Sequence, residues 1–435
     1  MAPVISLNSY GLNILNTLAQ LQSGELSGAT RLSLSENLTS LPLEVLALAD
    51  SLEILDLSNN QLTSLPEELK QLTKLKIIFA SNNKFTDLPE VLGQCPNLEM
   101  IGFKSNKINH VPEHSLPPRL RWLILTDNCI ETLPNSLGER PRMQKLALAG
   151  NRLTALPSTM DQLSNLELLR ISANNLTAFP QQLLSLPKLA WLAFSGNPFT
   201  QNDINNVSVP VIKPSDYTLH EELGKGASGV ISRATWNNLQ TNFTNDIAVK
   251  VFKGEITSDG YPNDELQACL KVGNHPNLIQ SLAQVNQDDC LALIMNLIPK
   301  HYKNLGLPPC FESCTRDKFS DGFTLPIDKI VKIVNQMTEV FEHMHLNKVC
   351  HGDLYAHNTL FDSQANIIFG DFGAATMYHM LTDFQQQKIK EIEQRALNYF
   401  IDDLLQICEP QDQKSDDYAR LQKRVNGFEE QLSAV

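Results

Sequence analysis

The sequence lacks long apolar runs, an excess of positive charge and closely spaced cysteines. No stretch approaches the roughly 18 consecutive apolar residues of a membrane-spanning helix, so none is expected. Lys and Arg together number 35 against 48 Asp and Glu, which gives a net charge of −13. This acidic balance argues against a nucleic-acid backbone or an anionic membrane as a general partner.

Features of secreted proteins are also missing. Residues 1–20 lack the basic start and the small-residue cleavage site of a signal peptide. The 8 cysteines are scattered without a short-spaced framework, which is typical of reduced thiols, so we expect a cytoplasmic protein. The 435 residues, 42% of them hydrophobic, are enough for two or three domains of about 150 residues each.

The first half of the chain contains a repeat. An asparagine returns at intervals of 22 or 23 residues, and the segment around the second one reads LEILDLSNNQLTSLP. The repeated asparagines are Asn37, Asn60, Asn83, Asn106, Asn128, Asn151, Asn174 and Asn197. Self-similarity at one period over this length indicates stacked structural repeats.

Each part of the repeat has a physical role. The alternating leucines before the asparagine predict a short strand with its leucines on one face. The asparagine amide can satisfy backbone groups of the adjacent coil, and a following pair such as Leu65-Pro66 favours an extended return. One coil cannot bury its leucines alone, so successive coils must stack.

These motifs resemble the leucine-rich repeat family in its short cytosolic form. The resemblance implies an α/β solenoid, or horseshoe, which we assign to residues 1–205. Leucines at helical spacing within residues 8–28 predict a capping helix ahead of the repeats.

The outward strand positions form columns that a solenoid presents on its concave face. Solvated sheet faces are normally polar, but these columns are rich in aliphatic and aromatic residues, which favours a docking site for a protein partner. The partner-binding candidates are Trp122, Lys145, Leu168, Arg170 and Trp191. The alternative is that these side chains pack on each other across coils.

The repeat stops after Phe199, and the polar residues 206–216 are interpreted as a linker to a second domain, residues 217–435. This domain opens with the glycine pattern Gly224, Gly226 and Gly229, followed by an apolar strand. A glycine loop between strands can fold its backbone amides over phosphates. A flexible hairpin turn is the plain alternative, and a dinucleotide fingerprint would require a following helix.

A single lysine, Lys250, lies within the apolar strand 247–251. A lysine on a buried strand costs free energy unless it is paired, so an anionic partner is expected. Glu265 is the preferred candidate, ahead of Asp264.

Two further motifs follow, HGDLYAHN at residues 351–358 and DFG at residues 371–373. Together with the glycine loop and the Ala-x-Lys of the strand, they resemble the protein kinase family in order and in catalytic-loop spacing. The resemblance implies a bilobal α+β domain that uses ATP and Mg²⁺. Only a short stretch follows the DFG motif, which predicts a truncated C-lobe.

The resemblance also implies roles for individual residues. The residues implied for the nucleotide site are Gly224, Gly226, Gly229, Ile231, Ala248, Lys250 and Glu265. Those implied for catalysis are Lys250, Asp353 and Asn358, and those for Mg²⁺ are Asn358 and Asp371. Asp353 would accept the proton of the substrate hydroxyl, and Lys250 would hold phosphates while pairing with Glu265.

The pattern departs from the kinase family at three points. Gly352 replaces an arginine that many kinases use to receive a phosphorylated activation loop, which argues against that mode of switching. Tyr355 stands where Ser/Thr kinases usually carry lysine, and the Ala-Pro-Glu signature is absent. The whole chain resembles the leucine-rich-repeat-containing protein kinases.

The leading hypothesis is an ATP- and Mg²⁺-dependent protein kinase that acts on Ser/Thr hydroxyls of proteins recruited by the concave face. A small-molecule phosphotransferase is one alternative, because His-Gly-Asp also resembles aminoglycoside phosphotransferases. A non-catalytic scaffold, a pseudokinase joined to a binding module, is the other. Retention of all five polar catalytic residues argues against the scaffold.

Overall fold

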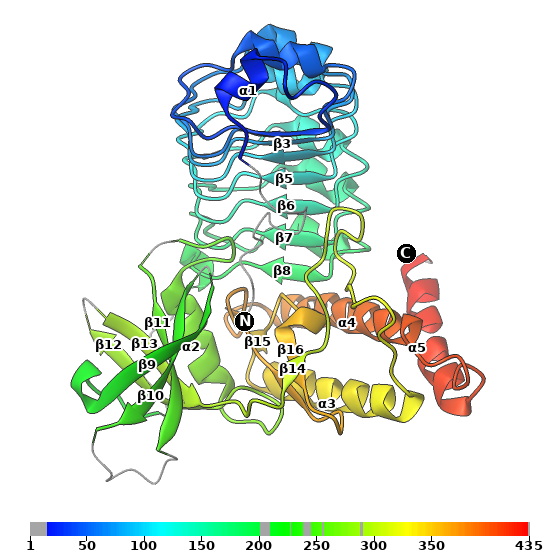
Figure 1. The fold of residues 1–435 in the computed structure, drawn as a ribbon. Helices are drawn as coiled ribbons and strands as arrows, with labels where there is room; N and C mark the ends of the chain where they lie inside the picture. Colours follow the sequence, from blue (N-terminus) through cyan, green and yellow to red (C-terminus); the bar gives the residue numbers. More distant parts are fainter. Residues whose placement is uncertain are drawn as a thin grey trace. The chain divides into compact units, whose positions relative to one another are not determined.

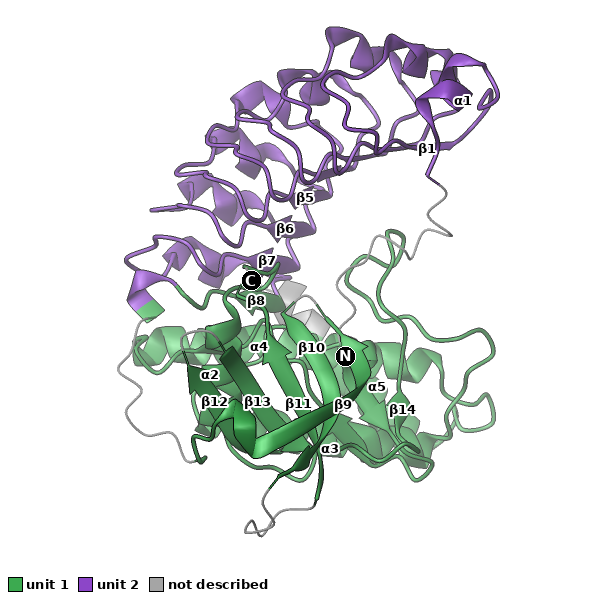
Figure 2. Cartoon of the chain, turned by 60° about the vertical axis from the view of Figure 1, so that its left-hand side comes forward, with its two compact units in different colours: residues 1–9, 190–196, 200–435 green, residues 10–189, 197–199 purple. Residues whose placement is uncertain are grey.

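The computed structural model contains two compact units (Figures 1 and 2). One unit comprises the repeats up to Leu189 together with residues 197–199, and the other contains residues 190–196 and the chain from Thr200 onward. The described residues are 15–200, 209–226, 228–237, 245–254, 256–287 and 290–433, of which 429–433 are described by their backbone alone.

Every repeat contributes one three-residue strand. The strands pair in parallel in the order of the sequence. They are β1 (Arg31–Ser33), β2 (Ile54–Asp56), β3 (Ile77–Phe79), β4 (Met100–Gly102), β5 (Trp122–Ile124), β6 (Lys145–Ala147), β7 (Leu168–Arg170) and β8 (Trp191–Ala193). From β2 to β7 the strand register aligns the columns expected from the sequence, so the predicted solenoid is confirmed.

The repeated asparagines form a ladder of hydrogen bonds between coils. The Nδ2 of Asn128 donates to the carbonyls of Phe103 and Leu125, both at 3.0 Å, and its Oδ1 accepts from the amide of Ile108 at 3.0 Å. The equivalent bonds to two carbonyls recur at Asn60, Asn83, Asn106, Asn151 and Asn174. Each amide therefore satisfies backbone groups of its own coil and of the preceding one.

The return of most coils is a proline in extended conformation followed by a short 3₁₀ helix. Pro66, for example, has φ −72° and ψ 150° and directly precedes such a helix. The 3₁₀ helices of the repeats are η2 (Leu43–Leu48), η3 (Glu67–Gln71), η4 (Glu90–Gln94), η5 (Glu113–Ser115), η6 (Asn135–Glu139), η7 (Ser158–Gln162), η8 (Gln181–Ser185) and η9 (Pro198–Thr200).

The capping helix is shorter than the leucine spacing predicts. Helix α1 covers only Leu18–Gln22, beginning at a capping box between Thr17 and Gln20. Turns follow it because Gly24 has φ +78°, a conformation that ends a helix. The prediction of a helix over residues 8–28 is therefore wrong for residues 15–17 and 23–28, and its part before Leu15 lies outside the described residues.

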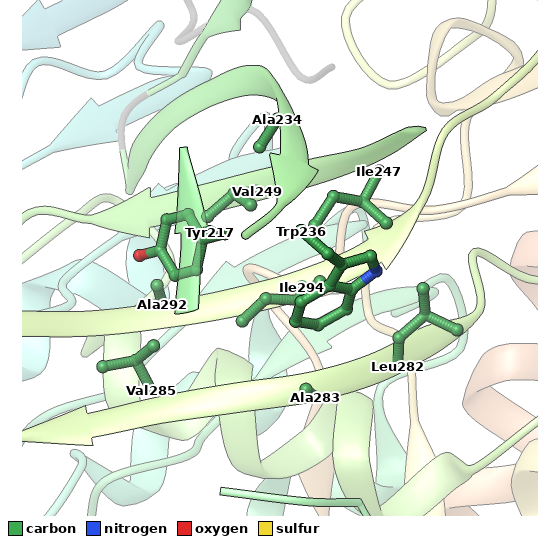
Figure 3. Close-up of a cluster of buried hydrophobic side chains, with 10 residues drawn as sticks. All are labelled: Tyr217, Ala234, Trp236, Ile247, Val249, Leu282, Ala283, Val285, Ala292 and Ile294. Carbon is green, nitrogen blue, oxygen red and sulfur yellow. The ribbon is translucent and has the colours of Figure 1, made fainter. Parts of the chain in front are cut away.

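The unit that contains the chain from Thr200 onward (unit 1, green in Figure 2) holds a five-stranded antiparallel sheet in the order β12-β13-β11-β10-β9. The strands are β9 (Tyr217–Lys225), β10 (Gly229–Trp236), β11 (Asp246–Phe252), β12 (Ser281–Gln287) and β13 (Cys290–Asn296). One face carries the buried cluster drawn in Figure 3, which includes Trp236, Val249 and Ile294. The other face packs on helix α2 (Pro262–Val272) through residues such as Ala248 and Leu266.

The remainder of this unit is mainly helical. Its helices are α3 (Ile327–Leu346), α4 (Asp383–Gln406) and α5 (Asp416–Ser433), with 3₁₀ turns η10 (Pro214–Asp216) and η11 (Ala356–Asn358). Its short strands are β14 (Lys303–Asn304), β15 (Val349–Cys350), β16 (Thr359–Phe361), β17 (Ile367–Phe369) and β18 (Thr376–Met377). No helix in the described ranges is both long and apolar enough to cross a membrane.

Replacing one ladder asparagine should destabilise the solenoid. Asn128→Ala leaves a buried amide and two carbonyls without their partner, so we expect the free energy of unfolding to fall by about 2 kcal/mol. Urea denaturation followed by circular dichroism measures the change. The exposed Asn109 provides the control, because Asn109→Ala should change stability by less than about 0.5 kcal/mol. Equal effects of the two substitutions would contradict the ladder's role.

Candidate active site

Strand alternation in β11 determines the face of the sheet on which Lys250 lies. Along β11, Ile247 and Val249 point into the cluster of Figure 3, whereas Ala248 packs on the opposite face, toward α2. Lys250 is two residues beyond Ala248 and therefore shares its face. There its ammonium forms an ion pair with the buried Glu265 of α2. The structure thus brings together the lysine and the carboxylate that the sequence paired.

The ammonium of Lys250 is surrounded by negative charge. Burial opposes its protonation, but the neighbouring carboxylates of Glu265 and Asp371 outweigh this and raise the pKa of Lys250. Burial likewise opposes ionisation of Asp371. Lys250 and the amide of Gly373, 3.3 Å from Asp371 Oδ1, nevertheless lower the pKa of this carboxyl. Both groups are therefore charged at neutral pH, which suits the binding of an anion and a cation side by side.

Asp264, the less favoured candidate, does not pair with Lys250. Its Oδ2 is buried and has no hydrogen-bond partner within the described part of the chain. Burial raises the pKa of Asp264 to about 6. The choice between the two adjacent acids was therefore settled by helix geometry, since consecutive residues on α2 point about 100° apart.

The glycine loop joins two antiparallel strands. Gly226 N donates to Gly229 O at 2.9 Å and tightens the turn between β9 and β10. A Cβ on Gly229 would lie 2.4 Å from Val251 O, so only glycine allows this close approach. A strand follows the loop, which removes the dinucleotide-fingerprint alternative. Ile231 lies opposite Lys250 in the β10–β11 register and packs beside Ala248.

Asp353 and Asn358, which the sequence predicts for a catalytic loop, are hydrogen-bonded to each other. Asn358 Nδ2 donates to Asp353 Oδ2 at 2.8 Å and to Asp353 O at 3.0 Å. Asn358 Oδ1 is buried and, in the described residues, accepts no hydrogen bond. Asp371 lies two residues after the end of β17, with φ +61°. The backbone amide before it, Gly370 N, donates to Asn358 O at 3.3 Å. A free carboxamide oxygen near a carboxylate fits the oxygen ligands that Mg²⁺ prefers.

A buried glutamate that the sequence did not reveal anchors the start of the catalytic loop. Glu393 Oε1, on α4, accepts the amides of His351 at 2.6 Å and Gly352 at 3.1 Å. Its Oε2 contacts His345 Nε2 at 2.8 Å. The only sequence signal was an acidic residue on the buried face of the amphipathic stretch that forms α4.

A second acid holds the loop near its end. Asp317 Oδ1 accepts the amide of Ala356 at 2.8 Å, and burial together with the nearby Asp403 raises the pKa of Asp317. Asp403 in turn accepts the amide of Asp317 at 2.9 Å and pairs with the guanidinium of Arg316 at 2.7 Å. No motif in the sequence marked this network, because its members lie in different segments.

The five predicted partner-binding side chains are buried. Their exposed fractions are 4% for Trp122, 7% for Lys145, 7% for Leu168, 3% for Arg170 and 2% for Trp191. Lys145 Nζ lies 4.3 Å from the ring centre of Trp122, so these two pack across coils, as the alternative anticipated. The expectation that all five are exposed is therefore wrong. Trp191 is covered by aromatic rings of its own unit, described below.

Comparison with known proteins supports both halves of this description. Residues 217–406 match the family model of the protein kinase domain, and residues 50–90 and 141–199 match leucine-rich repeat models. The chain therefore combines leucine-rich repeats with a protein kinase domain.

The individual relatives match parts of the chain. A probable serine/threonine-protein kinase of Dictyostelium discoideum is 28% identical over 168 residues, which cover 36% of this chain and 11% of that protein. A leucine-rich repeat protein of Leptospira interrogans with a solved structure is 30% identical, over 40% of this chain and 51% of that one, with a TM-score of 0.35. The match thus spans about a tenth of the curated relative.

Removing the loop anchor should cost stability. Glu393→Ala leaves two buried amides without an acceptor, so we expect the free energy of unfolding of the kinase domain to fall by at least about 2 kcal/mol. Glu391, on the same helix, forms a partly exposed pair with Lys388 at 2.8 Å and accepts from the exposed Gln387 Nε2 at 3.5 Å. The matched Glu391→Ala should cost less than about 1 kcal/mol. Urea titration of both variants measures the difference, and equal costs would show that Glu393 is not an anchor.

Proposed function

We propose that this protein is an ATP- and Mg²⁺-dependent protein kinase that phosphorylates serine and threonine hydroxyls. The observation that carries the proposal is the assembled pair of sites, Lys250 with Glu265 and Asp353 with Asn358, within a domain that matches the kinase family. A scaffold needs neither a buried ammonium nor a catalytic carboxylate, whereas phosphoryl transfer needs both.

Residues of the five-stranded sheet would bind the nucleotide. Gly224, Gly226 and Gly229 allow backbone amides to approach phosphate oxygens closely. Lys250 offers a fixed positive charge to the phosphates, and Glu265 keeps its side chain oriented. Ile231 and Ala248 provide the apolar surface of the same site.

Residues of the loops after β15 and β17 would bind the metal ion and the substrate hydroxyl. Asn358 Oδ1 and the ionised Asp371 would hold Mg²⁺, which when bound screens the negative charge of the phosphates. In the described ranges, no three His, Cys, Asp or Glu side chains converge on a metal site by themselves, so phosphate oxygens would complete the coordination. Asp353 is the group that accepts the proton of the substrate hydroxyl, and its bond from Asn358 orients it.

The choice of serine and threonine, and of protein substrates, has separate support. The curated relative is named a probable serine/threonine-protein kinase, and leucine-rich repeats generally mediate contacts between proteins. We propose that the repeats recruit the substrate. Because the five predicted side chains are buried, we propose recruitment through one column of the sheet, formed by the third residue of each strand. Its half-buried members include Asp56, Ile124 and Ala147.

The central test measures phosphoryl transfer by the full chain. The purified protein is incubated with labelled ATP and Mg²⁺, with generic proteins and, separately, with a panel of metabolites. We expect label on protein serine and threonine, identified by phosphoamino acid analysis. Asp353→Asn should reduce the rate at least about a hundredfold, because a general base is lost.

A charge-matched variant and the other products separate the alternatives. Asp321→Asn removes an exposed carboxylate of the same unit and should leave the rate unchanged. Label on metabolites alone would indicate a small-molecule phosphotransferase. A folded protein that transfers label to nothing would be a scaffold, and phosphotyrosine as the only product would overturn the specificity.

A substitution that introduces one negative charge tests whether the repeats recruit the substrate. Ile124→Glu places a carboxylate on the half-buried column and should lower labelling of proteins in a cell extract about tenfold, the effect of losing one interface contact of moderate strength. Labelling of a short peptide should not change. Gln71→Glu adds the same charge on the exposed side of η3 and is the control. Unchanged labelling of proteins by Ile124→Glu would exclude recruitment through this column.

A further inference from the structure

Strand β8 lies among the elements of the kinase domain. Its Trp191 is 2% exposed and stands between two tyrosine rings. The indole stacks on Tyr355 at 5.3 Å with an interplanar angle of 3°, and on Tyr399 of α4 at 5.5 Å with an angle of 10°. His357 extends the column beyond Tyr355 at 5.2 Å, and the Arg316 guanidinium lies 5.0 Å from the Tyr399 ring centre. Such a stack fixes the planes of all its members.

Trp191 holds the two residues that follow the catalytic aspartate. Its Nε1 donates to Leu354 O at 2.9 Å, and its ring covers Tyr355. These contacts restrain the peptide on the C-terminal side of Asp353 at two consecutive residues. The side chain of Asp353 projects from the Cα next to that peptide, so the direction of its carboxylate depends on the indole.

The backbone of β8 approaches the other side of Asp353. Gly352 has φ +71°, and a Cβ there would lie 2.6 Å from Leu192 O and 3.1 Å from Ala374 O. No side chain fits between these carbonyls. The glycine in the HGD motif is therefore required by the position of β8, and the arginine of other kinases has no room in this chain.

The same strand also reaches the segment after the DFG motif. Phe194 N, just beyond β8, donates to Thr376 Oγ1 at 3.2 Å. Thr376 belongs to β18, which pairs with β15 directly before the catalytic loop. Residues 191–194 therefore contact both segments that flank the reacting groups.

We propose that Trp191 of β8 is a positioning residue, which holds the catalytic loop and the segment after Gly373 in the arrangement required for phosphoryl transfer without prior phosphorylation. This inference rests on the proposed kinase function. In it, β8 stays in contact with the catalytic loop at all times. It explains the two departures from the kinase pattern at Gly352 and Tyr355. Gly352 leaves room for the backbone of β8, and Tyr355 stacks on Trp191.

The kinetic test replaces Trp191 in the full chain. Trp191→Leu removes the stack and the hydrogen bond, so kcat should fall about a hundredfold, the cost of an ångström-scale misplacement. KM for ATP should stay within about twofold, because uniform nucleotide binding is not removed. Trp191→Phe keeps an aromatic ring without the N–H donor and should retain intermediate activity. Trp236→Phe, in the sheet core of Figure 3, is the control for loss of a buried indole and should leave kcat unchanged.

A double-mutant cycle with Tyr355 separates positioning from general destabilisation. Tyr355→Leu should reproduce the kcat loss of Trp191→Leu, and the double variant should be no slower than either single one, because both remove the same stack. Losses that multiply in the double variant would overturn the shared role. So would an unchanged kcat in Trp191→Leu.

A measurement that needs no activity decides the structural part. Amide hydrogen exchange of residues 351–358 and 371–377 should become at least about tenfold faster in Trp191→Leu than in the wild type, while Trp236→Phe leaves it unchanged. Unchanged exchange in Trp191→Leu would refute the proposal. If the wild type phosphorylates nothing, the kinase function fails by itself, and the exchange result still shows whether β8 holds the loop.

Discussion

The kinase domain depends on how firmly the loop 351–358 is held. Its backbone is bound from three sides, by the carboxylate of Glu393 at the first residues, by the indole of Trp191 in the middle and by the carboxylate of Asp317 near the end. Asn358 closes the loop on itself. A loop with this many fixed peptide groups would need little reorganisation during the proposed phosphoryl transfer.

The sheet side of the site obeys a different constraint. A buried ammonium must keep a negative partner, and Lys250 has two, Glu265 and Asp371. The pair joins β11 to α2, and the same ammonium interacts with Asp371, which lies two residues after β17. Electrostatic necessity therefore links β11 and α2 to the segment that follows β17.

Much of this arrangement could be predicted from local sequence. The asparagine period revealed the coils because each repeat is stabilised by its neighbours. The apolar residues around Lys250 revealed that this lysine needed a partner. The anchors Glu393 and Asp317 could not be found this way, because each reaches the loop from about 40 residues away in sequence without a motif of its own. Their acidic side chains look like ordinary solvated charges until the fold buries them.

The two errors have the same origin. Periodicity assigned Trp191 to the same surface as Trp122, but a repeating pattern carries no information about what else in the chain covers a given strand. In the same way, leucine spacing predicted a long capping helix, whereas the backbone freedom of Gly24 ends it. The burial of Trp191 and the end of the capping helix both depend on interactions that the spacing of the repeats does not record.

Arrays of this kind lengthen and shorten easily, since each coil contacts only its neighbours. In this chain that freedom ends at the coil that carries residues 190–196, which belong to the same compact unit as the kinase domain. Coils gained or lost earlier in the chain leave the interior of that unit intact, whereas deletion of this coil removes part of it. Natural chains of the same architecture should accordingly vary in their number of coils and agree on the last.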